Sequence, residues 1–145
     1  MKKLLIPLLI TNFIYAQSFV PDAPELDLKS YILIEPNTNT VIAEFNSDFE
    51  IVPASMTKIM TTYIAAEYLA DGAISLEEEV LISTKAWNMK GSRMFIEQGK
   101  KVTMSDLLRG MMIQSGNDAS VAIAEFLGGN EEGFVDLMNA YAADL

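Results

Sequence analysis

Pro53-Ala54-Ser55-Met56-Thr57-Lys58 is the stretch that decides the fold, because it ends a loop and opens a helix. An apolar stripe follows at spacings of three and four residues, which is the period of an amphipathic helix. The stripe consists of Met56, Ile59, Met60, Tyr63, Ile64 and Ala66. Proline fits poorly inside a helix, so we expect the helix to begin after Pro53. It should run to about Leu69, because Asp71-Gly72 is a typical helix stop.

This helix places Ser55 in its first turn and Lys58 one turn later on the same face. A serine hydroxyl is a poor nucleophile until a base takes its proton. The chain has no histidine and no cysteine, so a Ser-His-Asp triad and a thiolate nucleophile are both excluded. The nearby base is then the Lys58 amine, which must be neutral when it accepts that proton. The helix N-terminus favours negative charge on Ser55, and we expect the Ser55 backbone N–H to be free to serve an oxyanion. Ser-x-x-Lys is nevertheless a short pattern that also arises by chance, so it needs a second element.

Composition limits the classes of protein to which the chain can belong. It has 145 residues, half of them apolar or aromatic, which suits one globular domain or part of one. The formal net charge of −10 argues against a nucleic-acid-binding role, because phosphate contacts need a basic surface. Without cysteine or histidine the chain has no disulfide framework, and a zinc site is not expected.

Residues Met1–Ala16 have the pattern of a secretory signal peptide. Lys2 and Lys3 form the positive start, and the apolar stretch from Leu4 to Tyr15 is too short to span a bilayer comfortably. An uncleaved N-terminal anchor is the alternative. We expect residues 17–145 to be exported, to the periplasm or to the outer face of the cytoplasmic membrane.

The rest of the chain predicts a mixture of strands and helices. We expect a hairpin, a third strand and three further helices. The strands are Ser30–Glu35, Thr40–Phe45 and Glu79–Ser83. Of the helices, the first follows Thr103 as its N-cap, the second runs from Ala119 to Leu127, and the third begins near Glu131. We expect Leu107, Leu108, Met111 and Met112 to be buried, Trp87 to pack, and residues 87–99 to be irregular. The apolar stripe of the last helix still continues at Leu145, so we expect the sequence to be part of a longer protein.

Ser115-Gly116-Asn117 is the second element, on a turn between two predicted helices. Ser115 could pass a proton between Lys58 and a leaving group. Asn117 could bind a substrate amide or hold Lys58 in place. The alternative is that both are ordinary helix-boundary residues, with Asn117 as an N-cap.

Taken together, the two motifs resemble the serine penicillin-recognising enzymes, whose set is S-x-x-K, then S-x-N, then K-T-G. Several segments are similar to the low-molecular-mass penicillin-binding proteins, which are D-alanyl-D-alanine carboxypeptidases. These segments are 53–61, Gly91-Ser92-Arg93-Met94-Phe95, Leu108-Arg109-Gly110, 114–119 and Leu137-Met138-Asn139. Gly116 stands where class A β-lactamases carry Asp, and the resemblance takes glycine here as the carboxypeptidase pattern.

The resemblance implies an α+β fold of the β-lactamase/DD-peptidase kind: a helical cluster with an antiparallel sheet, incomplete at the C-terminus. Residues 17–145 would be the N-terminal part of the catalytic domain. Ser55 would attack the bond between the two D-alanines of a peptidoglycan stem peptide, with Lys58 as base and Ser115 as proton carrier. Asn117 and Gly116 would bind substrate, β-lactams would acylate Ser55, and no metal or cofactor would take part.

The K-T-G element does not occur in these residues. In the family it lies on a later strand, which also supplies an oxyanion donor, and losing one such donor typically costs about 10²–10³ in rate. We therefore expect the 145 residues alone to be almost inactive and to leave apolar surface uncovered. Any contact with the membrane would be made by a C-terminal part of the protein beyond these residues. The alternatives are a non-catalytic envelope protein that binds peptidoglycan or penicillin, and a β-lactamase.

Overall fold

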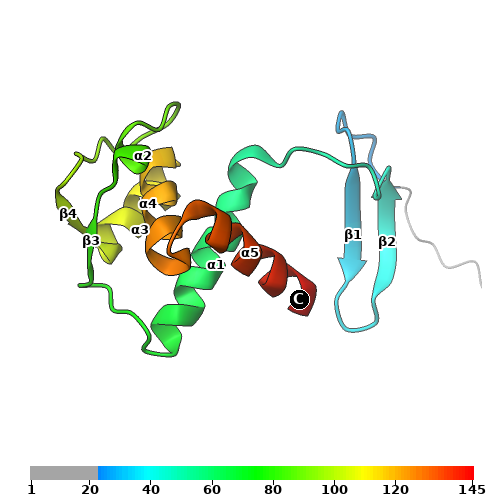
Figure 1. Cartoon of the computed structure of the whole chain (residues 1–145). Helices are drawn as coiled ribbons and strands as arrows, with labels where there is room; N and C mark the ends of the chain where they lie inside the picture. The colour runs from blue at the N-terminus through cyan, green and yellow to red at the C-terminus, as the bar shows by residue number, and fades with distance from the viewer. Residues whose placement is uncertain (1–22) are drawn as a thin grey trace, which may run out of the picture. The chain divides into compact units, whose positions relative to one another are not determined.

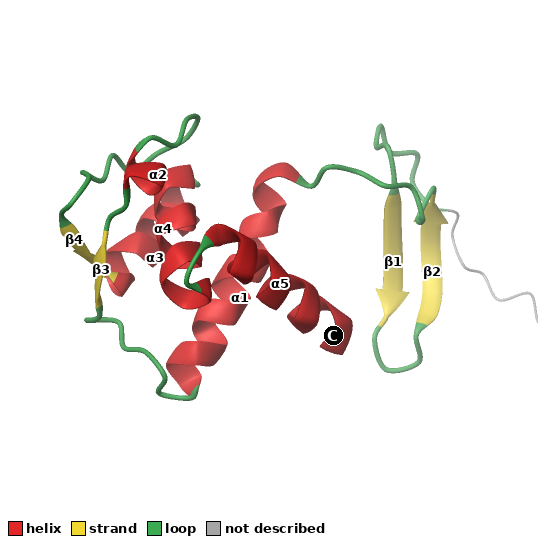
Figure 2. Ribbon diagram, viewed as in Figure 1, coloured by secondary structure: helices red, strands yellow, loops and turns green. Residues whose placement is uncertain are grey.

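A computed structural model describes residues 23–145, and two compact units divide the chain, of which the described parts are residues 23–50 and residues 51–145 (Figure 1). The signal peptide predicted for residues 1–16 lies outside the described residues. The composition of helices and small antiparallel sheets confirms the predicted α+β class (Figure 2).

The described part of the first unit is the predicted hairpin. Strand β1 (Tyr31–Glu35) pairs antiparallel with β2 (Thr40–Phe45), and the register shifts between Leu33 and Ile34. The Glu35 carboxylate closes the turn, because it accepts hydrogen bonds from the backbone N–H groups of Asn37 (3.2 Å) and Thr38 (2.8 Å). None of residues 23–50 is buried, so this part of the chain has no core of its own.

The second unit is a helical cluster. Its elements are the 3₁₀ turn η1 (Ala54–Met56), α1 (Thr57–Ala70), β3 (Glu79–Leu81), α2 (Thr84–Trp87), β4 (Lys101–Thr103), α3 (Met104–Gln114), α4 (Asn117–Gly128) and α5 (Glu131–Asp144). Helix α4 contacts α1, α2, α3 and α5. Such a position requires a helix that is apolar on most sides, and α4 buries Ala119 and every residue of 121–124.

Two groups of buried side chains stabilise this unit. The larger joins α3 and α4 to the small sheet of β3 and β4, and the smaller joins α1, α4 and α5 around Phe134. Helix α3 begins as predicted, because the Thr103 hydroxyl accepts a hydrogen bond from the backbone N–H of Asp106 at 3.1 Å. Asn130 caps α5 in the same way through the N–H of Gly133, at 2.7 Å.

Several expectations from the sequence were wrong in detail. The region predicted to be irregular begins with the last residue of α2, and the small sheet has a second strand, β4, that was not predicted. Met112 is 65% exposed and Trp87 is 43% exposed, so neither belongs to the core. In the stripe of α1, Ile64 is buried but Met56 and Ile59 are exposed. Apolar periodicity located these helices but did not show which of their faces would be covered.

Candidate active site

The predicted site residues lie where three helices meet. Ser55 is in the turn η1, Lys58 is the second residue of α1, and Ser115 and Asn117 lie at the junction between α3 and α4. Helix α1 packs against both α3 and α4. The structure therefore brings together side chains that are about sixty positions apart in the sequence.

Lys58 is at the centre of this group. Its Nζ atom lies 3.3 Å from Ser55 Oγ, 3.3 Å from Ser115 Oγ and 2.8 Å from Asn117 Oδ1. The Ser115 hydroxyl also donates to Ser55 Oγ at 3.0 Å. The two hydroxyls and the amine form a closed triangle of hydrogen-bond distances, through which a proton can move in either direction.

One of the two serines, and the residue before the other, have backbone angles that are uncommon for residues other than glycine. Ser115 is left-handed, with φ 54° and ψ 37°, and Ala54, directly before Ser55, has φ 48°. Such angles are unfavourable by about 1–3 kcal/mol each and concentrate at active sites. At Ser115 this conformation ends α3 and lets α4 begin two residues later, with the hydroxyl directed at Lys58.

Asn117 is held on both sides. Its Nδ2 donates to the backbone carbonyl of Lys90 at 2.7 Å, and its backbone N–H donates to the carbonyl of Ser92 at 2.7 Å. Because the NH₂ group is used by Lys90, Oδ1 is the atom that faces Lys58. The N-cap position of α4 belongs to Gly116, which makes no side-chain cap. The alternative of Asn117 as an ordinary N-cap was therefore wrong.

Gly116 was expected to bind substrate, and the structure gives a different reason for a glycine there. The residue is buried, and a Cβ added to it would lie 3.0 Å from Asp118 Oδ1 and 3.3 Å from the backbone nitrogen of Met94. A side chain at this position would thus force these neighbours to shift by a few tenths of an ångström.

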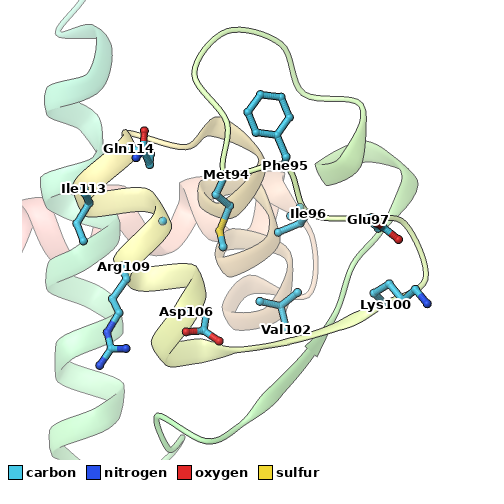
Figure 3. A pocket seen from close by; sticks show the side chains of 11 residues that line it. Met94, Phe95, Ile96, Glu97, Lys100, Val102, Asp106, Arg109, Ile113 and Gln114 are labelled. Atoms are coloured by element: carbon cyan, nitrogen blue, oxygen red, sulfur yellow. The ribbon is translucent and has the colours of Figure 1, made fainter.

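Two cavities lie near these helices. One of about 480 Å³ is open to the candidate site and mostly apolar. It is lined by Ser55, Lys58, Ile59, Thr62, Tyr63, Met111, Met112 and Ser115. A larger one, about 750 Å³, lies between the 94–97 segment and α3, with Asp106 and Arg109 on the helix side (Figure 3). The larger cavity contains none of the predicted site residues, so we place the site by its chemistry rather than by cavity size.

The arrangement suits a serine nucleophile with a lysine base. In the structure Nζ donates to all three oxygens, as the charged amine with its three donors does. The neutral amine would have two N–H donors and one lone pair. Asn117 Oδ1 and Ser115 Oγ can accept the two hydrogens, which leaves the lone pair for the proton of Ser55. Within residues 23–145 no three His, Cys, Asp or Glu side chains gather as a metal site.

The chain matches the family described as Peptidase_S11, D-alanyl-D-alanine carboxypeptidase, over residues 17–145. It belongs to this family. It is 42% identical over 131 residues to the D-alanyl-D-alanine carboxypeptidase DacA of Escherichia coli K12, with 86% of this chain and 32% of DacA covered. It is 46% identical over 119 residues to DacF of Bacillus subtilis 168, covering 82% and 31% respectively.

Solved structures of the family have the same fold. The D-alanyl-D-alanine carboxypeptidase DacD of Francisella tularensis superposes with a TM-score of 0.79 at 40% identity, covering 86% of this chain and 30% of that one. Penicillin binding protein 5 of Haemophilus influenzae gives a TM-score of 0.78 at 35% identity, covering 86% and 37%. The chain thus spans about a third of the length of these relatives. None of the helices in residues 23–145 combines the length and apolarity needed to cross a membrane.

Sequence reasoning did not identify the residues that hold Asn117 and its turn in place without belonging to the site. Lys90 and Ser92 act through backbone carbonyls, which leave no trace in residue type. Asp118 lies in the first turn of α4, where acidic residues are common, yet it is only 1% exposed. The one available signal was the Gly91-Ser92 pair, because glycine marks a turn or a close approach.

Proposed function

We propose that the whole protein is a serine-type D-Ala-D-Ala carboxypeptidase that removes the terminal D-alanine from peptidoglycan stem peptides. The observation that carries this proposal is the contact of Lys58 Nζ with both serine hydroxyls at 3.3 Å, in a chain without histidine or cysteine. Membership of the carboxypeptidase family supports the choice of substrate.

In the acylation step, Lys58 takes the proton of Ser55 as the Oγ atom bonds to the carbonyl carbon of the penultimate D-alanine. The tetrahedral intermediate collapses when the bond from this carbon to the nitrogen of the last D-alanine breaks. That nitrogen needs a proton to leave. Ser115 donates one and regains it from Lys58, in keeping with the 3.3 Å contact between the two.

In the deacylation step, water attacks the ester carbon, and the Ser55 oxygen recovers a proton as the shortened peptide leaves. Asn117 keeps Lys58 in place through Oδ1, at 2.8 Å, and contributes to substrate binding. Gly116 supports this turn by its small size. A β-lactam would acylate the same serine. No cofactor is assigned to either step.

The substrate implies a location outside the cytoplasm, in the periplasm or at the outer face of the cytoplasmic membrane. Residues 1–16 would direct export, and residues 17–145 would form the N-terminal part of the catalytic domain. Membrane contact through a segment beyond residue 145 belongs to the same proposal. Fractionation of cells that produce the complete protein would test the location directly.

The test is to incubate the complete protein with a fluorescent penicillin and to locate the adduct by mass spectrometry. We expect a long-lived adduct on Ser55 and release of D-alanine from a peptide that ends in D-Ala-D-Ala. The Ser55→Ala variant should form no adduct. Ser105→Ala is the matched control, because Ser105 lies on α3 outside the site, and it should react like the wild type.

Other outcomes would favour the alternatives. Rapid turnover of the penicillin without a lasting adduct would indicate a β-lactamase. Tight but non-covalent binding, equal in the wild type and in Ser55→Ala, would indicate an envelope protein that binds peptidoglycan or penicillin.

A further inference from the structure

Asp118 is the one acidic side chain in the buried interior of the described residues. Its carboxylate accepts four backbone N–H groups. Oδ1 accepts from Met94 (3.0 Å) and Ala119 (2.9 Å), and Oδ2 accepts from Phe95 (2.8 Å) and Ile96 (3.3 Å). No Lys or Arg lies within salt-bridge distance of it in the described chain. A buried carboxylate satisfied by backbone donors alone fixes the path of the segment that supplies them.

That segment is also the one that holds Asn117. It comprises residues 90–96, and its Lys90 and Ser92 carbonyls accept the side-chain and backbone N–H groups of Asn117, each at 2.7 Å. The Ser92 hydroxyl donates a third hydrogen bond from this segment to the α3–α4 junction, to the backbone carbonyl of Gln114. Asp118 follows Asn117 directly in the sequence. Its carboxylate therefore anchors residues 94–96 of the loop, while residues 90–92 of the same loop orient Asn117.

We propose that Asp118 is a positioning residue for the reaction: it holds the 90–96 loop so that Asn117 Oδ1 faces Lys58. The inference rests on the proposed function for its kinetic consequences. Its structural consequence, that Asp118 keeps residues 90–96 in one conformation, can be measured without an activity assay. The competing explanation is that Asp118 stabilises the fold and has no particular effect on the site.

Replacing Asp118 by Asn is a sharp test because no orientation of an amide satisfies the four donors. In either orientation the NH₂ group faces two backbone N–H groups, either those of Met94 and Ala119 or those of Phe95 and Ile96. The change preserves shape and volume, so the loss falls on the hydrogen bonds from the loop and from the Ala119 N–H.

The experiment measures the rate of Ser55 acylation by a fluorescent penicillin in the complete protein. We expect Asp118→Asn to slow acylation about 10- to 100-fold, the range typical of lost supporting contacts and of misplacements near 1 Å. Glu125→Gln is the matched control, because it makes the same acid-to-amide change on the same helix. Glu125 accepts from Ser83 Oγ at 2.6 Å, away from the site, and its substitution should leave acylation unchanged.

A double-mutant cycle distinguishes positioning from general destabilisation. If Asp118 acts through Asn117, then Asp118→Asn should slow acylation far less in an Asn117→Ala background than in the wild type. Equal losses in the two backgrounds would overturn the inference. Hydrogen exchange gives a readout independent of activity: the amides of Met94, Phe95 and Ile96 should exchange faster in Asp118→Asn. An unchanged loop would also overturn it.

Ser92→Ala is a milder version of the same test, for use if Asp118→Asn does not fold. It removes the hydrogen bond from the Ser92 hydroxyl to the Gln114 carbonyl. It should slow acylation in the wild type and have little effect beside Asn117→Ala. A wild-type protein that forms no adduct at all would overturn the proposed function. The NMR signals of the Asn117 side-chain amide would then test the structural consequence, since they should shift in Asp118→Asn and stay in place in Glu125→Gln.

Discussion

At the scale of single residues, the proposed function requires the Lys58 amine both to give and to receive protons. Lys58→Arg keeps the positive charge and much of the length, but a guanidinium does not lose its proton in proteins. A general base contributes typically about 10²–10⁴ in rate, so we expect acylation of Ser55 to fall by about that factor. The measurement is the second-order rate constant for a fluorescent penicillin.

The control for this substitution is Lys85→Arg. Lys85 forms an exposed ion pair with Glu131 at 2.6 Å, outside the site, and the ordinary behaviour of surface pairs predicts little change. A Lys58→Arg protein as fast as the Lys85→Arg protein would show that Lys58 is not the base.

Gly91 offers a second test, because the chain contains a matched glycine. Gly91 and Gly99 both have positive φ, 86° and 74°, so alanine at either position should destabilise the fold by about 1–2 kcal/mol. A Cβ at Gly91 would lie 2.8 Å from Asn117 Nδ2, whereas a Cβ at Gly99 meets nothing within 4 Å.

We therefore expect Gly91→Ala, and not Gly99→Ala, to displace Asn117 and to slow acylation about tenfold or more. Thermal unfolding and acylation should be measured on both variants. Similar acylation rates in two proteins of similar stability would show that the position of Asn117 does not limit the reaction.

At the scale of elements, local chemistry predicted most of what the structure contains. The hairpin, the Thr103 cap and the glycine-terminated α4 follow from turn residues, capping residues and apolar spacing, all of which act over a few positions. Residue type and spacing predicted Ser55, Lys58, Ser115 and Asn117 as site residues, and the structure brings these four side chains together. Strand β4 and the burial of Asp118 could not be predicted in this way, because each depends on segments twenty or more positions away.

The hairpin turn makes a pH-dependent prediction. Hydrogen bonds from the Thr38 hydroxyl, then from Asn37 and the Thr38 N–H, lower the pKa of Glu35 from its ordinary 4.5 to about 2. Because this pKa is depressed in the folded turn, the stabilisation is complete above pH 4.5 and is lost as the pH falls towards 2. We expect an NMR titration of the Glu35 carboxyl to have its midpoint near the lower value.

Substitution of Thr38 checks the cause. Thr38→Ala removes the largest contribution and should move the Glu35 midpoint upwards, whereas Thr38→Ser keeps the hydroxyl and should leave it in place. If both variants titrate like the wild type, the hydroxyl is not what lowers the pKa of Glu35.

At the scale of the molecule, large apolar side chains remain exposed near the candidate site. Ile59 is 69% exposed on α1, and Ile113 is 77% exposed on α3. Monomeric proteins seldom leave large apolar patches uncovered, and the expectation of uncovered surface from the sequence agrees with these values. The chain also spans only about a third of its relatives, so these faces are the ones on which to look for further packing.

The contrast between the two units leads to a prediction for the 145-residue chain in solution. A two-stranded hairpin is at best marginally stable in water, and residues 23–50 bury none of their side chains. Helix α4, in contrast, buries residues 121–124 in the centre of the helical unit. Its amides should exchange only when that unit opens, with protection approaching the folding equilibrium constant, about 10³ or more for a stable small domain.

We therefore expect hydrogen exchange to show amides of β1 and β2 that are almost unprotected beside strongly protected amides in α4, within one sample. The comparison is internal, so differences in concentration or temperature between samples do not affect it. Equal protection in the two units would mean that the hairpin is covered in solution. The exposure of Ile32 (49%) and Leu33 (55%) would then have to fall when the covering contact forms, which labelling of the strand side chains would detect.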